Sequence, residues 1–126
     1  MKLNGREVHF KRTIWATNAI TKMCPDGDLQ RFNELFNGDT AEQILNMAAF
    51  IAIMSEGYEK ARAFQASRSG EAYEEDPVTL DEIMALDDMD IFVELQNEAV
   101  KAWVDDGKVT VESEPVKTKK KRKAQD

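Results

Sequence analysis

Cysteine and histidine are scarce in this chain, and each occurs once among its 126 residues. The lone Cys24 excludes a disulfide within the chain, and Cys24 with His9 cannot supply the Cys/His set of a structural zinc site. The longest apolar stretch, residues 47–54, has eight residues, far short of the roughly 20 that a membrane-spanning helix needs. The first residues lack the apolar core of a secretory signal. These absences predict a soluble protein of a reducing compartment.

Recognisable catalytic motifs are missing as well. The sequence has no phosphate-binding glycine loop, nucleotide fingerprint or serine elbow. His9 lies on a predicted strand without a recognisable nucleophile beside it, which favours a half-exposed strand residue over a catalytic base. Asp26–Gln30 resembles the opening of a calcium loop, but Arg31 and Asn37 stand where glycine and a bidentate glutamate are required. We therefore expect no enzyme, no cofactor and no metal site.

Charge divides the chain into two parts. The 17 basic and 24 acidic residues give a net charge of −7, but residues 117–126 carry six of the basic residues and one acidic residue. Residues 1–116 therefore hold 11 basic and 23 acidic groups, a net charge of −12. An acidic body is not typical of a nucleic-acid-binding domain. The basic segment is too short and too uniformly charged to bury anything, which predicts a disordered tail over residues 113–126.

The first third of the chain predicts a hairpin and two helices. Asn4-Gly5 favours the positive φ angles of a tight turn, so we expect a small β-hairpin in which Val8 and Phe10 share a face. Thr13 can cap a helix that runs to about Met23. The turn signal at residues 25–27 ends it, and Asp28 can then cap a short helix over residues 29–36.

A long helix is predicted to begin at Asp39 or Thr40, where Glu42 or Gln43 can complete a capping box. Ile44, Met47, Ile51 and further residues form one apolar stripe, but Leu45, Phe50 and Ile53 lie off it. An apolar surface that covers most of a helix places it at the centre of a domain, or buries its second side against a partner. The sequence leaves both alternatives open.

The second half predicts two more helices. Residues 67–77 form a loop of Ser, Gly and acidic residues, and Thr79 with Glu82 forms a capping box for a short helix to Leu86. A last long helix opens at Asp87 or Asp88 and ends near residues 106–107, and residues 108–112 could extend as a strand. We thus expect a mainly α fold: one domain of about five helices with an N-terminal β-hairpin over residues 1–112, followed by the tail.

Partner-binding residues are predicted among the large apolar side chains. Flexible Met side chains suit partners of varied shape, and a Trp at the rim of a small helical domain is a common binding anchor. For any single position, a core role is the plainer interpretation. The predicted partner-binding residues are Trp15, Phe50, Ile53, Met54 and Trp103.

The order of these features resembles a tail assembly chaperone of long-tailed (siphovirus-type) bacteriophages. The residues that carry the resemblance are the hairpin of residues 3–11, the helix opening at residues 13–20, and the apolar helix of residues 41–54. After them come the acidic segment of residues 79–83 and a final helix that leads to the Lys-rich tail. The resemblance is one of layout and spans nearly the whole chain.

The resemblance implies a mostly helical protein of the host cytoplasm that acts in virion morphogenesis. Such proteins bind the tape-measure protein, keep its apolar helix soluble and help to recruit tail-tube subunits. Self-association is also implied, and so is a longer second form made by a programmed ribosomal frameshift near the position of Lys119–Lys123. No membrane is implied, and nucleic acid is not an expected partner.

Two alternatives stay open. A small helical regulator that contacts nucleic acid through its basic end predicts salt-sensitive binding that is lost when residues 117–126 are deleted. A structural head–tail joining protein predicts that the chain is present in purified virions.

Overall fold

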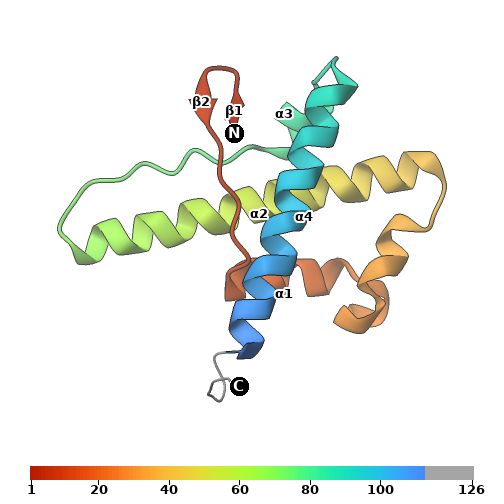
Figure 1. Ribbon diagram of the computed structural model, residues 1–126, viewed down its shortest axis with the longest axis horizontal. Helices are drawn as coiled ribbons and strands as arrows, with labels where there is room; N and C mark the ends of the chain where they lie inside the picture. Colours follow the sequence, from red (N-terminus) through yellow and green to blue (C-terminus); the bar gives the residue numbers. More distant parts are fainter. Residues whose placement is uncertain (113–126) are drawn as a thin grey trace.

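The architecture centres on one long helix that the other elements surround. The computed structural model describes the backbone of residues 1–112 and the side chains of residues 1–106. The elements that it describes are β1 (Lys2–Leu3), β2 (Arg6–Glu7), α1 (Ile14–Met23), the 3-10 helices η1 (Pro25–Gly27) and η2 (Leu29–Phe36), α2 (Thr40–Arg68), α3 (Leu80–Met84) and α4 (Met89–Glu112). Figure 1 shows α4 crossing over the long α2. The predicted mainly α fold with an N-terminal hairpin is confirmed.

The hairpin forms where Asn4-Gly5 allows it. Asn4 and Gly5 have φ angles of 52° and 84°, and positive φ at both central positions is the requirement of the two-residue turn that suits twisted strands. Leu3 pairs with Arg6 across the ladder. Leu3 and Val8 are buried in the main core, so the helices support a hairpin that is too short to be stable alone.

Side-chain caps begin the helices, largely as the sequence predicts. The Thr13 hydroxyl accepts from the Ala16 N–H at the start of α1, and Asp28 accepts from the Gln30 N–H at the start of η2. At α2, Asp39 accepts from the Glu42 N–H while the Glu42 carboxylate accepts from the Asp39 N–H, which completes the predicted capping box. The short helix predicted over residues 29–36 is a 3-10 helix rather than an α-helix.

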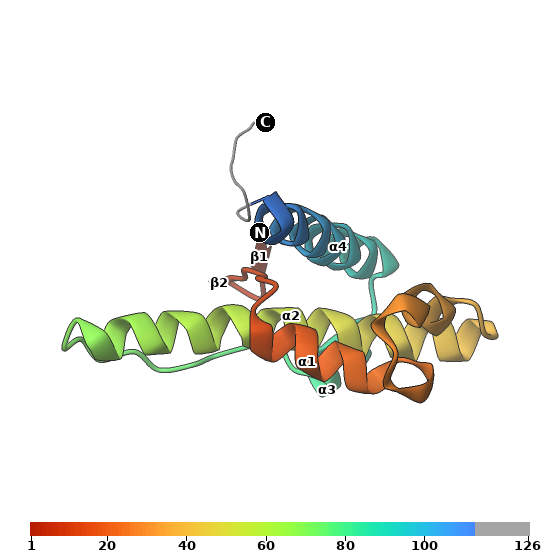
Figure 2. The same cartoon turned by 90° about the horizontal axis from the view of Figure 1, so that it is seen from below.

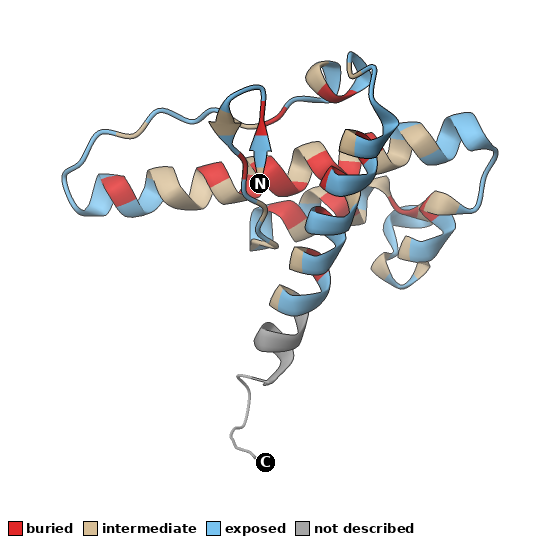
Figure 3. Cartoon of the chain, turned by 45° about the horizontal axis from the view of Figure 1, so that its top comes forward, coloured by how far each residue is buried: buried red, intermediate tan, exposed pale blue. Residues whose placement is uncertain are grey.

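Layers on opposite sides of α2 bury its middle. Seen from below in Figure 2, α4 lies on one side of α2, and α1 and α3 lie on the other. Figure 3 shows that the buried residues of α2 are concentrated near its centre. The core of buried apolar residues joins the hairpin, α1, α2 and α4, and its largest fully buried side chains are Phe50, Ile20, Ile51, Met54, Leu95 and Val78.

The connection from α2 to α3 runs back along α2 (Figure 1) and is attached to it by buried polar groups. The Glu59 carboxylate accepts from the Tyr73 hydroxyl at 2.7 Å and from the Asp76 N–H at 3.0 Å. The Ser55 hydroxyl accepts from the Val78 N–H at 2.9 Å. Burial and the hydrogen bond to Glu59 raise the pKa of Tyr73 to about 12. These bonds satisfy polar groups that would otherwise be costly to bury.

An ion pair joins the hairpin to α3. The Arg6 guanidinium donates to both carboxylate oxygens of Glu82, at 2.8 and 2.9 Å. Its Nε lies 3.2 Å from the Asp76 carboxylate, close enough for an ion pair, but makes no hydrogen bond. Thr79 accepts from the Glu82 N–H, as the predicted capping box requires of its first residue.

The last helix is longer than the sequence predicts. Residues 108–112, predicted as a possible strand, belong to α4, so that prediction is wrong. His9 also lies after β2 rather than in it, and it is exposed. The predicted disordered tail, residues 113–126, lies outside the described residues. No helix in the described part of the chain is long and apolar enough to cross a membrane.

Gly57 provides a test of how closely α2 approaches the start of α1. A Cβ at Gly57 would lie 2.8 Å from the Lys11 carbonyl oxygen and 3.0 Å from the Thr13 Oγ1. Helix propensity alone would make Gly57→Ala stabilising by about 1 kcal/mol. We expect the clash to prevail and to lower the free energy of unfolding by about 1–3 kcal/mol in urea denaturation. Ser67→Ala, at an exposed position of α2, is the control and should be neutral or slightly stabilising; a more stable Gly57→Ala variant would contradict the packing.

The Arg6–Glu82 pair predicts a pH dependence of stability. The hydrogen bond from Arg6 lowers the pKa of Glu82 from its ordinary value of 4.5. A carboxylate whose pKa is lower in the folded state stabilises the fold fully above that ordinary value, and the contribution is lost as the pH falls through the folded-state pKa. We expect Glu82→Gln to lower the free energy of unfolding at pH 7, and the difference from the wild type to shrink towards pH 3. A difference that stays constant between these pH values would show that the charge of Glu82 does not contribute.

Candidate partner-binding groove

The five predicted partner-binding residues do not form one exposed surface. Phe50 and Met54 have no accessible surface, Trp103 is 8 % exposed, and Ile53 is partly buried against the core. A fully buried side chain cannot touch a partner unless the fold opens. The prediction that Phe50, Met54 and Trp103 lie on a docking surface is therefore wrong for the folded chain.

The packing of α2 explains this correction. Residues off its main stripe are covered by other parts of the same chain, because α1, η2, α3 and α4 all pack against α2. Phe50 meets the ring of Trp103 at 5.7 Å, and Phe32 of η2 stacks on Trp103 at 5.1 Å between ring centroids. The Arg12 guanidinium covers Trp103, 3.7 Å from the ring centroid. Of the two alternatives that the sequence leaves open, the structure has α2 at the centre of a domain.

Trp15 is the exception among the five. It is 39 % exposed on α1, and the Lys60 ammonium lies 5.1 Å from its ring centroid. Trp15 is far enough out to touch a partner. It remains a predicted anchor, separate from the buried Phe50–Trp103 pair.

The exposed apolar residues of α4 form a second set, offset from its core face. Phe92, Leu95, Ala99 and Trp103 are buried, with the spacing of one helix face. Met89, Val93, Val100 and Val104 are exposed and follow one another at intervals of four, seven and four residues. Such intervals align on one side of a helix. Hence α4 has a second apolar stripe, which is exposed in the part of the chain whose side chains the structure describes.

At the N-terminal end of α4, this stripe borders a groove. Two hollows of about 190 and 170 Å³ share Ile44 of α2 and Phe92 of α4 as lining residues. Because three methionines line them, we call them together the methionine groove. Its apolar lining residues are Phe36, Ile44, Met47, Ile83, Met84, Leu86, Met89 and Phe92.

The methionines give this groove an adaptable rim. Met84 is 51 % exposed and Met89 is 62 % exposed, on either side of the short connection between α3 and α4. The unbranched thioether side chain of Met can change rotamer to fit partners of different shape. An apolar groove of this kind can bind one face of an amphipathic helix.

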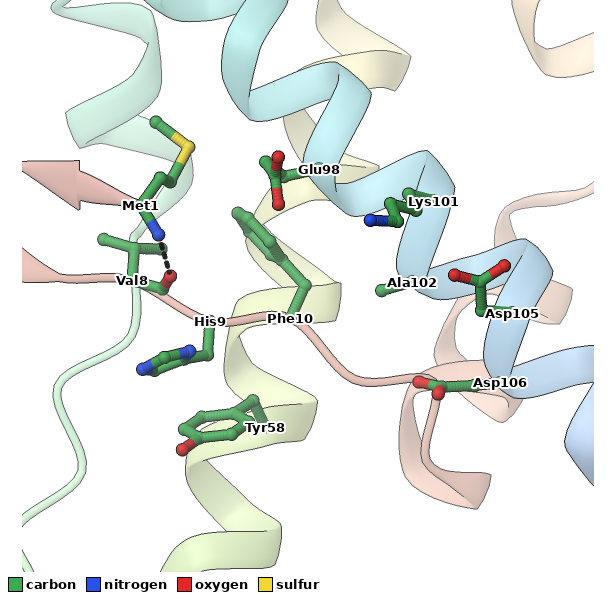
Figure 4. A pocket seen from close by; sticks show the side chains of 10 residues that line it. All are labelled: Met1, Val8, His9, Phe10, Tyr58, Glu98, Lys101, Ala102, Asp105 and Asp106. Atoms are coloured by element: carbon green, nitrogen blue, oxygen red, sulfur yellow. Dashed lines mark hydrogen bonds between the residues drawn. The ribbon is translucent and has the colours of Figure 1, made fainter.

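A larger pocket of about 300 Å³ lies on the opposite flank of α4 and is polar. Figure 4 shows Glu98, Lys101, Asp105 and Asp106 of α4 facing the segment that carries His9 and Phe10. The rings of His9 and Tyr58 lie 4.7 Å apart and tilted by 33°. Asp106 accepts from the Arg12 backbone N–H at 2.9 Å.

The polar pocket brings one histidine together with three carboxylates, those of Glu98, Asp105 and Asp106. The described lining contains no serine or cysteine beside His9, so the nucleophile–base pair of covalent catalysis is not assembled there. In the part of the chain whose side chains are described, no group of three His, Cys, Asp or Glu residues could hold a metal ion. Cys24 is buried, its thiol donates to the Ile20 carbonyl, and burial raises its pKa, which disfavours the reactive thiolate.

The sequence contains the signal for the second apolar stripe of α4, although it did not identify the stripe as a site. Met89, Val93, Val100 and Val104 widen the apolar face of the last predicted helix beyond what one contact surface needs. Dividing that face into two stripes requires knowing which of its residues are buried, because the angle of each residue around the helix axis is then measured from the buried side. Met84, on a helix of five residues, gives no comparable signal.

Comparisons of this chain with protein-family models, curated proteins and solved structures found no match.

Core and groove residues should respond differently to truncation. We expect Phe50→Ala to lower the free energy of unfolding by about 3–5 kcal/mol, because it leaves a cavity beside Trp103. Met89→Ala, at an exposed position in the first turn of α4, should change it by no more than about 0.5 kcal/mol. Chemical denaturation measures both values. Equal losses in the two variants would mean that Met89 belongs to the core.

Proposed function

We propose that this protein is a phage tail assembly chaperone that binds the tape-measure protein and keeps it soluble during virion morphogenesis in the host cytoplasm. Two considerations support the proposal: the resemblance of the chain's layout to that family, and the uncovered methionine groove. We further propose that the protein helps to recruit tail-tube subunits and can self-associate.

The groove is the main support for the proposal, because it could cover the apolar surface of a tape-measure protein. A long helix with an exposed apolar stripe aggregates unless the stripe is covered. Side chains at positions i, i+3, i+4 and i+7 of such a helix could pack against Ile44, Phe92 and the methionines of the groove. A flexible lining could accept successive segments of different sequence, as a chaperone for a long helix must.

The charge of the chain supports the same role. Residues 1–116 carry a net charge of −12. Mutual repulsion between copies of such a protein keeps a concentrated assembly in solution. A complex in which the groove covers the apolar stripe would therefore expose an acidic, well hydrated surface.

Co-expression tests this function. We expect this chain to increase the soluble fraction of the tape-measure protein encoded in the same genome, and the double variant Met84→Gln/Met89→Gln to reduce that gain several-fold by removing apolar contacts. Phe64→Gln is the matched control, since Phe64 is 64 % exposed on a distant part of α2. The soluble fraction is measured by centrifugation and immunoblotting.

Two results would count against the function. Tape-measure protein that stays equally insoluble with and without this chain would contradict chaperone activity. Activity that survives the double variant but is lost with Phe64→Gln would move the binding surface to the other end of α2.

A further inference from the structure

The charge around the methionine groove is of one sign. Residues 39–54 and 79–98, which supply nearly all of its lining, contain nine acidic residues and no Lys, Arg or His. The acidic residues are Asp39, Glu42, Asp81, Glu82, Asp87, Asp88, Asp90, Glu94 and Glu98. By contrast, residues 57–68 of α2 hold Lys60, Arg62 and Arg68 with Glu59 as the one acid. The acidic residues are therefore concentrated in the two segments that line the groove, although Glu98 itself faces the polar pocket.

The described part of the chain neutralises little of this charge. Among the described residues, Glu82 is the one acid of the nine that forms an ion pair, with Arg6. Asp88 lines the groove itself, and one of its carboxylate oxygens accepts from the Asp90 N–H at 2.9 Å. Asp87, Asp90 and Glu94 are exposed around the N-terminal turns of α4. Asp88 thus places a carboxylate at the groove, and we call Asp88 together with the exposed Asp87, Asp90 and Glu94, its neighbours at the start of α4, the acidic rim.

We propose that the methionine groove selects a basic amphipathic helix: a helix with an apolar stripe flanked by Lys or Arg residues. This inference deepens the proposed function, on which it rests, by stating the chemistry of the bound segment. The apolar stripe occupies the groove, and the flanking cations lie opposite the acidic rim. An acidic helix with the same stripe would meet like charges, which weakens its binding. The rim thus acts on specificity, whereas the groove supplies most of the contact area.

Other occupants are less consistent with this surface. A second copy of the chain would bring another acidic groove end against the first one. The chain's own segment 117–126 is basic but has one apolar residue, Ala124, so it could neutralise the rim without filling the groove. Both possibilities become outcomes of the test.

The test uses the full-length protein and three synthetic 18-residue peptides. The first has leucines at helical i, i+3, i+4, i+7 spacing and lysines elsewhere. The second replaces every lysine with glutamate, and the third keeps the lysines and replaces every leucine with serine. Fluorescence anisotropy of labelled peptides gives the dissociation constants at low and high salt, and sedimentation checks the association state of the protein.

We expect the Leu/Lys peptide to bind at least about tenfold more tightly than either of the others, since cations and an apolar stripe are both required. Its affinity should fall several-fold as salt screens the rim.

Variants of the protein test the same idea. Asp87→Lys/Glu94→Lys should weaken binding of the Leu/Lys peptide, while Glu74→Lys/Glu75→Lys, the same charge change on the exposed α2–α3 connection, should not. Met84→Gln/Met89→Gln should weaken it about tenfold or more.

Each contrary result has a distinct meaning. Equal binding of the Leu/Lys and Leu/Glu peptides, both weakened by the methionine variant, would overturn the charge selectivity and leave the chaperone proposal intact. Equal binding of the Leu/Lys and Ser/Lys peptides would overturn it in favour of charge attraction alone. Failure of all three to bind would overturn it too, with the co-expression experiment deciding on the chaperone function separately. A dimer that dissociates when the Leu/Lys peptide binds would show that a second copy occupies the same groove.

Discussion

The packing of other elements around α2 is the interaction on which the rest of the structure depends. A helix that is apolar over most of its circumference must be covered on several sides, and here α1, η2, α3 and α4 provide the cover. Burial of apolar surface is the main favourable term in folding, at about 25 cal/mol per Å². The positions of the hairpin, the α2–α3 connection and both flanks of α4 follow from how each of these elements reaches α2.

Close approach and polar attachment make that cover specific. Gly57 lets the start of α1 lie against α2 at a distance that a Cβ would not allow. Glu59 and Ser55 on α2 accept hydrogen bonds from the connection to α3, and Arg6 joins the hairpin to Glu82 of α3. Apolar burial alone does not fix the path of a long polar connection. Buried acceptors fix it, because only a small number of donors can reach them.

The candidate site is what this arrangement leaves uncovered. α4 uses one face to cover α2, and its second apolar stripe stays exposed beside the methionine groove. In the function proposed above, exposed methionines next to the acidic rim would combine adaptable apolar contact with discrimination by charge. The polar pocket on the other flank of α4 is larger. Its described lining contains no serine or cysteine nucleophile, and the described residues contain no metal-binding cluster.

Local signals predicted the secondary structure because each of them acts within a few residues. Asn4-Gly5 determined the hairpin, Thr13, Asp28, Asp39 and Thr79 determined where helices begin, and the apolar periodicities determined the helical class. The strand predicted over residues 108–112 was wrong, because a short alternating segment at the end of a helix can continue that helix equally well.

The same chemistry explains why the site could not be predicted with equal success. Phe50, Ile53 and Met54 look like surplus apolar residues as long as their neighbours in space are unknown. The structure buries Phe50 against Trp103 and Met54 in the core, and it leaves Ile53 partly buried. Met84 and Met89 look like ordinary helix residues until the angle between α3, α4 and α2 leaves them at a rim.

By itself, the sequence determined the helices, their caps and the charge of the groove end, since these depend on residue type and local spacing. The tertiary structure alone decided which apolar side chains are covered, because burial depends on contacts between segments far apart in the chain.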